Sequence, residues 1–199
     1  MIGSSPQTKQ DLLNELANLR DVELNFWLDI EPERFAHAVG EAWSAADTVR
    51  HLIKSTAPVT RALKLPRIFL QILFGQSRRT SISYRDLVER YCAVLAGGGK
   101  AGRFSPSACH VPADVAGWQR DLIYKCKAEI AALARAVEPW TEMNLNCCQL
   151  PHPLLGKLTV KEMLFFTLYH YEHHRAIVAG RLGTSGQSTL SISQRIGLA

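Results

Sequence analysis

The chain has no long hydrophobic run and no apolar segment near its N-terminus. Its most hydrophobic stretch, LPRIFLQILFG at residues 65–75, is too short to span a bilayer and contains a proline and an arginine. The first ten residues, MIGSSPQTKQ, lack the apolar core of a secretory signal peptide. We therefore expect a soluble cytoplasmic protein that does not insert into a membrane.

Cysteine pairs of the kind that bind zinc or form redox-active disulfides are also missing. The chain has five cysteines, and no two of them stand in a C-x-x-C arrangement. Without a secretory signal, an odd number predicts free thiols in a reducing compartment. The adjacent Cys147 and Cys148 are expected to be small packing residues rather than reactive thiols.

The charge of the chain has no strong excess of either sign. Of the 199 residues, 47% are apolar and 21% are charged, and the net charge is +5. These values fit one globular domain with its own core. The one dense basic patch surrounds the apolar run and consists of Arg61, Lys64, Arg67, Arg78 and Arg79. Such a patch could touch a membrane or nucleic acid, but a solvated rim around a segment that covers the core or meets another subunit is the better interpretation.

Three familiar catalytic motifs are absent. GGGK at residues 97–100 is not a phosphate-binding loop, because Val94 stands where the first glycine is required. H-E-x-x-H is excluded because Tyr171 follows His170, at the place of the glutamate. No glutamate is followed three residues later by a histidine, as di-iron helical bundles require.

Apolar residues recur at helical spacing in four segments, and none alternates as a strand would. The segments are residues 9–27, a helix that begins at Ser44 and precedes Pro58, residues 113–137, and residues 160–182. Four helices with apolar stripes predict an all-α four-helix bundle, formed by a single domain over residues 1–199. Residues 65–104 are expected to be a helical and loop insertion between the second and third helices. Residues 184–199 are expected to be a mobile tail.

Capping signals mark the ends of two of these helices. Ser44 is the expected N-cap of the second helix, with Asp47 favoured in the first turn by the helix dipole. Thr159 and Glu162 form a T-x-x-E capping box before the fourth helix. Gly183 stands where a left-handed residue commonly ends a helix.

The fourth helix carries three histidines within five consecutive positions, 170–174. On a helical wheel, His170 falls in the middle of the apolar stripe, His174 lies about 40° to one side and His173 about 60° to the other. Glu172 points away, towards solvent. Imidazoles at i and i+4 can converge on one ion, but core histidines with hydrogen-bond partners have the same spacing. The spacing alone does not separate these two interpretations.

A third ligand would come from His37, His51, His110 or His152. His51 lies at the polar edge of the second helix, which suits a ligand that faces a cleft and an exposed histidine equally. His152 lies between two prolines and is expected to structure a loop. His37 and His110 have no motif around them and are expected to be exposed.

Two stretches resemble the DinB-like superfamily of bacterial proteins. WSAADTVRHLIKS matches its second helix, which opens with Trp-Ser and carries a histidine before a leucine. HPLLGKLTVKEMLFFTLYHYEHHRAIV matches its HPxLGxLT loop and the histidine pair of its fourth helix. The resemblance implies a four-helix bundle of DinB/YfiT type. It also implies that His51, His170 and His174 hold a divalent zinc or nickel ion, without His173.

Three histidine ligands leave coordination positions open, as catalytic zinc sites do. The resemblance implies a metal-dependent enzyme: a transferase that joins a low-molecular-weight thiol, such as bacillithiol or mycothiol, to an electrophile, or else a hydrolase. It also implies a homodimer. Asp47, one turn before His51, could orient this histidine, although the helix dipole explains its position equally well. The alternative is a non-catalytic bundle that binds an apolar ligand or a protein partner through residues 68–74; nucleic-acid binding is supported by no motif.

Overall fold

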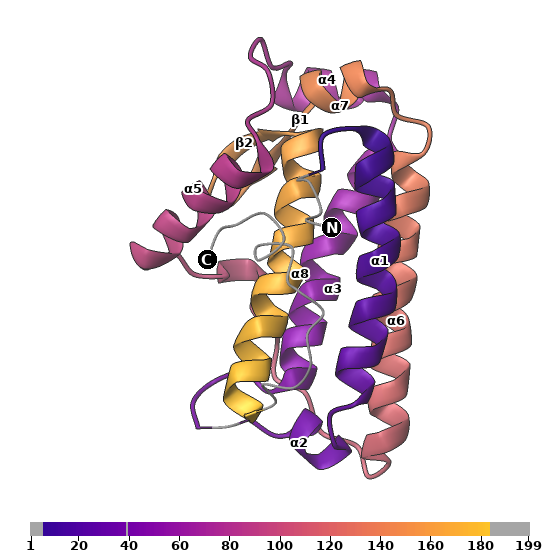
Figure 1. Ribbon diagram of the computed structural model, residues 1–199, viewed down its shortest axis with the longest axis vertical. Coiled ribbons are helices and arrows are strands. Elements are labelled where there is room, and N and C mark those ends of the chain that lie inside the picture. Colours follow the sequence, from indigo (N-terminus) through magenta and orange to yellow (C-terminus); the bar gives the residue numbers. More distant parts are fainter. Residues whose placement is uncertain (1–5, 39, 184–199) are drawn as a thin grey trace, which may run out of the picture.

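The computed structural model describes residues 6–38 and 40–183, except the side chains of residues 23 and 24. This part of the chain is mostly helical, which confirms the all-α class. Its four longest helices, α1 (Lys9–Leu28), α3 (Ala45–Leu63), α6 (Val115–Val137) and α8 (Val160–Leu182), run along the long axis of the molecule (Figure 1). The tail expected at residues 184–199 lies outside the described residues. No helix in the described part is long and apolar enough to cross a membrane.

The expected capping residues do begin and end these helices. The side chain of Ser44 accepts the backbone N–H of Asp47 at the start of α3. Thr159 and Glu162 form both hydrogen bonds of the capping box at the start of α8. Gly183 follows α8 with φ +66°, a left-handed conformation that glycine adopts without steric cost. Local sequence therefore determines where these two helices begin and where α8 ends.

The expected disturbance of the second helix at Pro58 is wrong. α3 continues through Pro58 to Leu63. The proline removes one backbone hydrogen bond, but the turns that follow it bury Val59, Thr60 and Leu63 in the core. Burial of these residues offsets the local cost of the proline, which residue preferences alone could not show.

Residues 65–104 form three short helices beside the long ones: α4 (Arg67–Phe74), α5 (Tyr84–Ala96) and the 3-10 helix η1 (Gly102–Phe104). α5 packs against α8, and α4 packs against the first strand of the hairpin that precedes α8. Figure 1 shows α4 and α7 (Glu142–Cys147) across one end of the long helices, with α2 (Pro32–Ala36) at the other. The expected insertion thus covers one side and one end of the molecule.

A small antiparallel hairpin precedes α8, although no strand was expected. β1 (Gln149–His152) pairs with β2 (Gly156–Thr159), with Gln149 opposite Thr159 and His152 opposite Gly156. Each strand has only four residues, too few for a visible alternation of apolar and polar side chains. The hairpin ends at the N-cap of α8 and so sets the position from which that helix starts.

The first half of α8 lies in the interior, and the expectation of one buried face was wrong for this half. Every residue from 162 to 168 is buried, because α1, α3 and α5 all pack around this helix. Glu172, expected in solvent, is only 5% exposed. Where other helices surround it, α8 has no solvent side for a helical wheel to assign. Exposed residues appear only in its last turns, at 176, 180 and 181.

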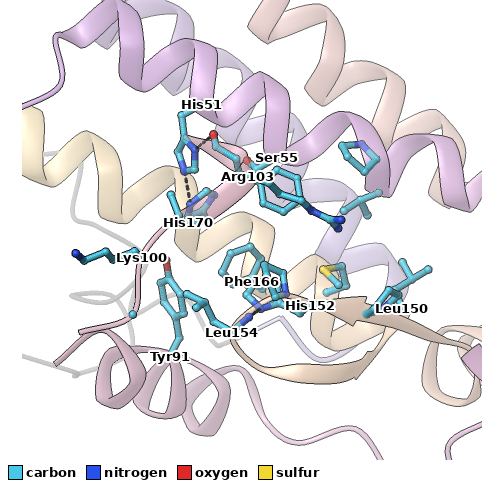
Figure 2. Close-up of a pocket in the computed structure, with 18 of the residues that line it drawn as sticks. His51, Ser55, Tyr91, Lys100, Arg103, Leu150, His152, Leu154, Phe166 and His170 are labelled. Carbon is cyan, nitrogen blue, oxygen red and sulfur yellow. Dashed lines mark hydrogen bonds between the residues drawn. The ribbon is translucent and has the colours of Figure 1, made fainter. Parts of the chain in front are cut away.

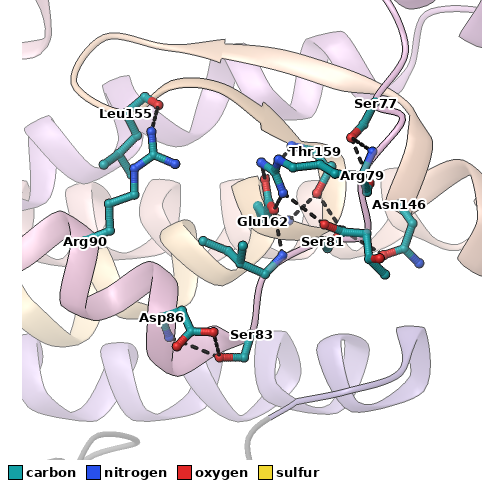
Figure 3. Close-up of polar contacts among 12 residues, drawn as sticks. Ser77, Arg79, Ser81, Ser83, Asp86, Arg90, Asn146, Leu155, Thr159 and Glu162 are labelled. Carbon is teal, nitrogen blue, oxygen red and sulfur yellow. Dashed lines mark hydrogen bonds and ion pairs between the residues drawn. The ribbon is translucent and has the colours of Figure 1, made fainter.

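Polar contacts join the segment before α5 to the start of α8 (Figure 3). The Arg79 guanidinium donates to both carboxylate oxygens of Glu162, one of them at 2.9 Å, and the N–H of Ile82 donates to the same carboxylate at 2.8 Å. Burial opposes the charge of Glu162. The hydrogen bonds from Arg79, Ile82 and Thr159 outweigh burial and hold its pKa below the ordinary value.

Candidate metal centre

Histidines from two long helices meet at one point in the interior. Nε2 of His51, on α3, lies 3.0 Å from Nε2 of His170, on α8. Nε2 of His174 lies 3.1 Å from the same atom of His170. One ligand atom from each of the three residues lies within 4.8 Å of the others. The structure thus brings together the three histidines that the resemblance implied, and this cluster could hold a metal ion.

The tautomer of His51 follows from its hydrogen bond. Its Nδ1 lies 2.8 Å from the carbonyl oxygen of Phe104, which can only accept, so Nδ1 carries the hydrogen (Figure 2). Nε2 of His51 therefore presents a lone pair to the cluster. His170 has one Nε2 facing two imidazoles, and in every neutral tautomer one of the two short contacts lacks a hydrogen bond. A cation among the three nitrogens would accept all three lone pairs.

Burial keeps the three imidazoles uncharged. It lowers the pKa of His51 below the ordinary value. Burial, and then the neighbouring imidazoles, lower the pKa of His170 well below it and that of His174 to about 3. Neutral imidazole is the form that binds a metal ion, because the proton and the ion compete for the same lone pair.

Aromatic rings hold the imidazoles in place. Trp43, just before α3, lies 5.0 Å from the ring of His51 and stacks on His174 at 6.2 Å with an interplanar angle of 16°. Phe166, one turn before His170, stacks on that ring at 4.9 Å. Packing on both sides restricts ring rotation, so the three nitrogens stay directed at one another.

The sequence did not predict the hydrogen bond between His51 and the carbonyl of Phe104. The glycine-rich loop that carries Phe104 includes Gly102, whose φ of +54° favours glycine. Lys54 Nζ donates to the carbonyl of Ser105 at 2.9 Å and fixes the same end of η1 to α3. A backbone carbonyl places no demand on residue type, so no sequence signal could have identified this partner of His51.

Asp47 does not orient His51. Its carboxylate accepts from the side chain of Ser44 and pairs with Arg50 at 3.0 Å. Asp47 is thus a first-turn residue of α3, as the helix dipole alone predicts.

The remaining histidines lie outside the cluster. His173 packs against Tyr169 and Tyr91, at ring distances of 5.8 and 6.1 Å. His152 structures the turn between β1 and β2, as expected, because its Nδ1 accepts two backbone N–H groups there. The other two, His37 and His110, are exposed, as expected.

A pocket of about 370 Å³ opens beside the three histidines. Its walls are mainly apolar and include Val59, Phe74, Leu95, Leu150, Leu154, Met163 and Phe166. Figure 2 shows Leu150 at the opposite end of the pocket from His51 and His170. The pocket is therefore elongated, with a cluster of nitrogen ligands at one end and an apolar interior.

No protein-family model matches the chain, and neither the curated proteins nor the solved structures contain a match. Any function must therefore be argued from the cluster and the pocket. The likeness to the DinB-like superfamily stays an expectation.

Proposed function

We propose that the protein is a metal-dependent enzyme of DinB/YfiT type, in which His51, His170 and His174 bind one divalent zinc or nickel ion. The convergence of three Nε2 atoms, on the buried His51 and His170 and the half-buried His174, supports this proposal most strongly. Zinc–imidazole bonds are about 2.0–2.1 Å long, so two nitrogens on one tetrahedral zinc ion lie about 3.3–3.4 Å apart. The separations of 3.0 and 3.1 Å are slightly shorter than this spacing, so the imidazoles would move apart by a few tenths of an ångström around an ion.

The donor set also suits these metals. Neutral imidazole is a preferred ligand of zinc and nickel, whereas magnesium and calcium require oxygen ligands. Three protein ligands leave room for a further group from the pocket. When bound, the ion would supply Lewis-acid chemistry and lower the pKa of a coordinated thiol or water.

The reaction that fits best is transfer of a low-molecular-weight thiol to an electrophile, with hydrolysis second. Among the described residues, no carboxylate lines the pocket, so no acidic general base is present there. A thiol, with an ordinary pKa of about 8.5, needs less help to ionise than water does. The thiol would lose its proton to solvent, and its sulfur would form a bond to carbon as the leaving group departs.

The alternative is a non-catalytic protein that binds a partner through α4. Four large apolar side chains of this helix are 53–71% exposed: Ile68, Phe69, Ile72 and Leu73. Such a face is typical of a contact with another chain, and a homodimer through it is compatible with either function. In the alternative, any ion at the histidines would be adventitious.

Metal analysis of protein purified without a histidine tag tests the proposal. We expect about one zinc or nickel ion per chain in the wild type and in His173→Ala, which keeps all three ligands. His51→Ala and His170→Ala should lose the ion, with affinity lowered at least about 100-fold. Circular dichroism should confirm that each variant folds. Equal loss in His173→Ala, or full occupancy without His51, would contradict this ligand set.

Thiol-dependent consumption of monochlorobimane separates the enzyme from the alternative. The metal-loaded wild type should accelerate the reaction of this electrophile with bacillithiol or mycothiol, and His170→Ala should not. Equal rates for both proteins would remove the support for the transferase.

A further inference from the structure

The pocket beside the histidines is asymmetric in charge. Two cationic side chains, Lys100 and Arg103, belong to its lining, and no aspartate or glutamate of the described residues does. The imidazoles in the lining add no positive charge, because burial lowers their pKa values and keeps them neutral. Both cations belong to exposed residues, so they attract an anion from the solvent side of a mainly apolar pocket, and salt should weaken this attraction.

Arg103 is held close to the cluster by the backbone around it. It lies in η1 next to Phe104, whose carbonyl oxygen accepts from His51. Its guanidinium lies 5.1 Å from the ring of Phe104. Within residues 6–38 and 40–183, neither Arg103 nor Lys100 forms an ion pair. The two cations are thus free to bind an acidic group of a ligand.

The rest of the pocket suits an apolar body. Its wall runs from Phe166, beside the histidines, to Leu150 at the far end. A volume of about 370 Å³ accommodates a molecule with a chain of several carbon atoms or an aromatic ring system. The pocket therefore combines an apolar wall with a guanidinium that belongs to its lining and forms no ion pair within the described residues.

We propose that the pocket binds an amphipathic organic anion, whose apolar body lies along the wall from Phe166 to Leu150 and whose carboxylate is held by Arg103, with Lys100 adding attraction. The inference rests on the proposed function in one respect: it takes this pocket as the substrate site. The anion is then the electrophile of the proposed transfer. Arg103 is a specificity-determining residue, because it binds a part of the ligand that does not react.

Three probes with the same ten-carbon chain test the inference: decanoate, 1-decanol and decylammonium. We expect decanoate to bind about tenfold more tightly than decanol, and decylammonium more weakly than either, by isothermal titration calorimetry. Arg103→Gln should weaken decanoate binding about fivefold and leave decanol binding unchanged. Lys100→Gln should have a smaller effect in the same direction, and Lys125→Gln, on the exposed surface of α6 outside the pocket lining, none.

The titrations are repeated with zinc-loaded and zinc-free protein, because a carboxylate also binds zinc. A preference for decanoate that requires zinc and is unaffected by Arg103→Gln would overturn the inference, while the metal site would stand. If the protein proves unable to bind zinc but still prefers decanoate through Arg103, the inference is supported and the proposed function is contradicted. Equal affinities for the three probes would overturn the inference. Ala62→Phe, which narrows the apolar part, should weaken decanoate and decanol alike.

Discussion

A buried imidazole is useful to this protein both inside and outside the cluster. Nδ1 of His152 accepts the backbone N–H groups of Leu154 at 3.2 Å and Leu155 at 3.0 Å, and its ring packs 4.2 Å from that of Phe166. Burial first, and the charge of Arg90 second, lower the pKa of His152 to about 4. The turn before α8 therefore depends on a neutral histidine.

This shift predicts how stability depends on pH. Below pH 6.5 the unfolded chain binds a proton at His152 that the folded chain does not bind until about pH 4. The free energy of unfolding should therefore fall as the pH drops from 6.5 to 4. His152→Asn keeps a hydrogen-bond acceptor but does not titrate. Over this pH range, its free energy of unfolding should therefore fall by up to about 3 kcal/mol less than that of the wild type. Urea unfolding at several pH values measures the difference, and parallel curves for the two proteins would contradict it.

At the residue scale, the sequence predicted the members of the histidine cluster better than their surroundings. The resemblance implied His51, His170 and His174 together, whereas the i, i+4 spacing of the last two did not separate metal ligands from core histidines. Phe104 could not be predicted, since its contribution is a carbonyl delivered by a loop 53 residues away from His51. Glu172 was placed wrongly because one helix cannot show how many neighbours surround it.

Two helices begin with the same capping box in different surroundings. Thr8 and Asp11 form the box of α1 at an exposed position. Thr159 of the α8 box is fully buried, and its hydroxyl also contacts Ser81 at 2.8 Å. The same local signal therefore has additional tertiary contacts at α8.

We expect the two boxes to differ in their contribution to stability. Thr8→Ala should lower the free energy of unfolding by about 1 kcal/mol, the usual effect of losing an N-cap. Thr159→Ala should cost about 2 kcal/mol, because it also leaves buried polar groups without a partner. Thr159→Ser, which keeps the hydroxyl, is the control. Chemical denaturation measures all three, and equal losses for the two alanine variants would show that burial of the cap does not matter.

Element boundaries were predictable where local contacts decide them. Caps at Ser44 and Thr159 mark the helix starts because their hydrogen bonds reach only three residues along the chain. Passage of α3 through Pro58 depends on contacts with distant residues. A short stretch of sequence around Pro58 does not contain the residues against which α3 packs. The pairing of β1 with β2 is local, but its strands are too short to show an alternation of apolar and polar residues.

At the scale of the whole molecule, one ion pair ties the outer layer to the interior. Arg79, in the segment between α4 and α5, binds Glu162 at the start of α8. The carboxylate is fully buried, whereas the arginine side chain is 43% exposed. The pair links residues 83 positions apart and orients α8, which carries two of the candidate ligands.

Arg79→Gln should therefore destabilise the protein, and Arg78→Gln should not. Loss of the partner leaves a buried charge, which costs about 2 kcal/mol at neutral pH after allowance for the exposure of the arginine. Since the folded pKa of Glu162 is lowered, its contribution is present above the unfolded pKa and is lost as the pH falls through the folded one. The difference between the two variants should narrow below about pH 4. Thermal unfolding at pH 7 and pH 3.5 measures it; a difference independent of pH would contradict an ionic contribution.

The ligand geometry is measured most directly in crystals of zinc-loaded protein, by anomalous scattering at the zinc absorption edge. We expect one anomalous peak between the three histidines, about 2.1 Å from Nε2 of His51, His170 and His174. The free coordination position of this zinc ion should face the pocket. A peak coordinated by His173, one that His51 does not reach, or none at all would show that these nitrogens converge for a reason other than a metal ion.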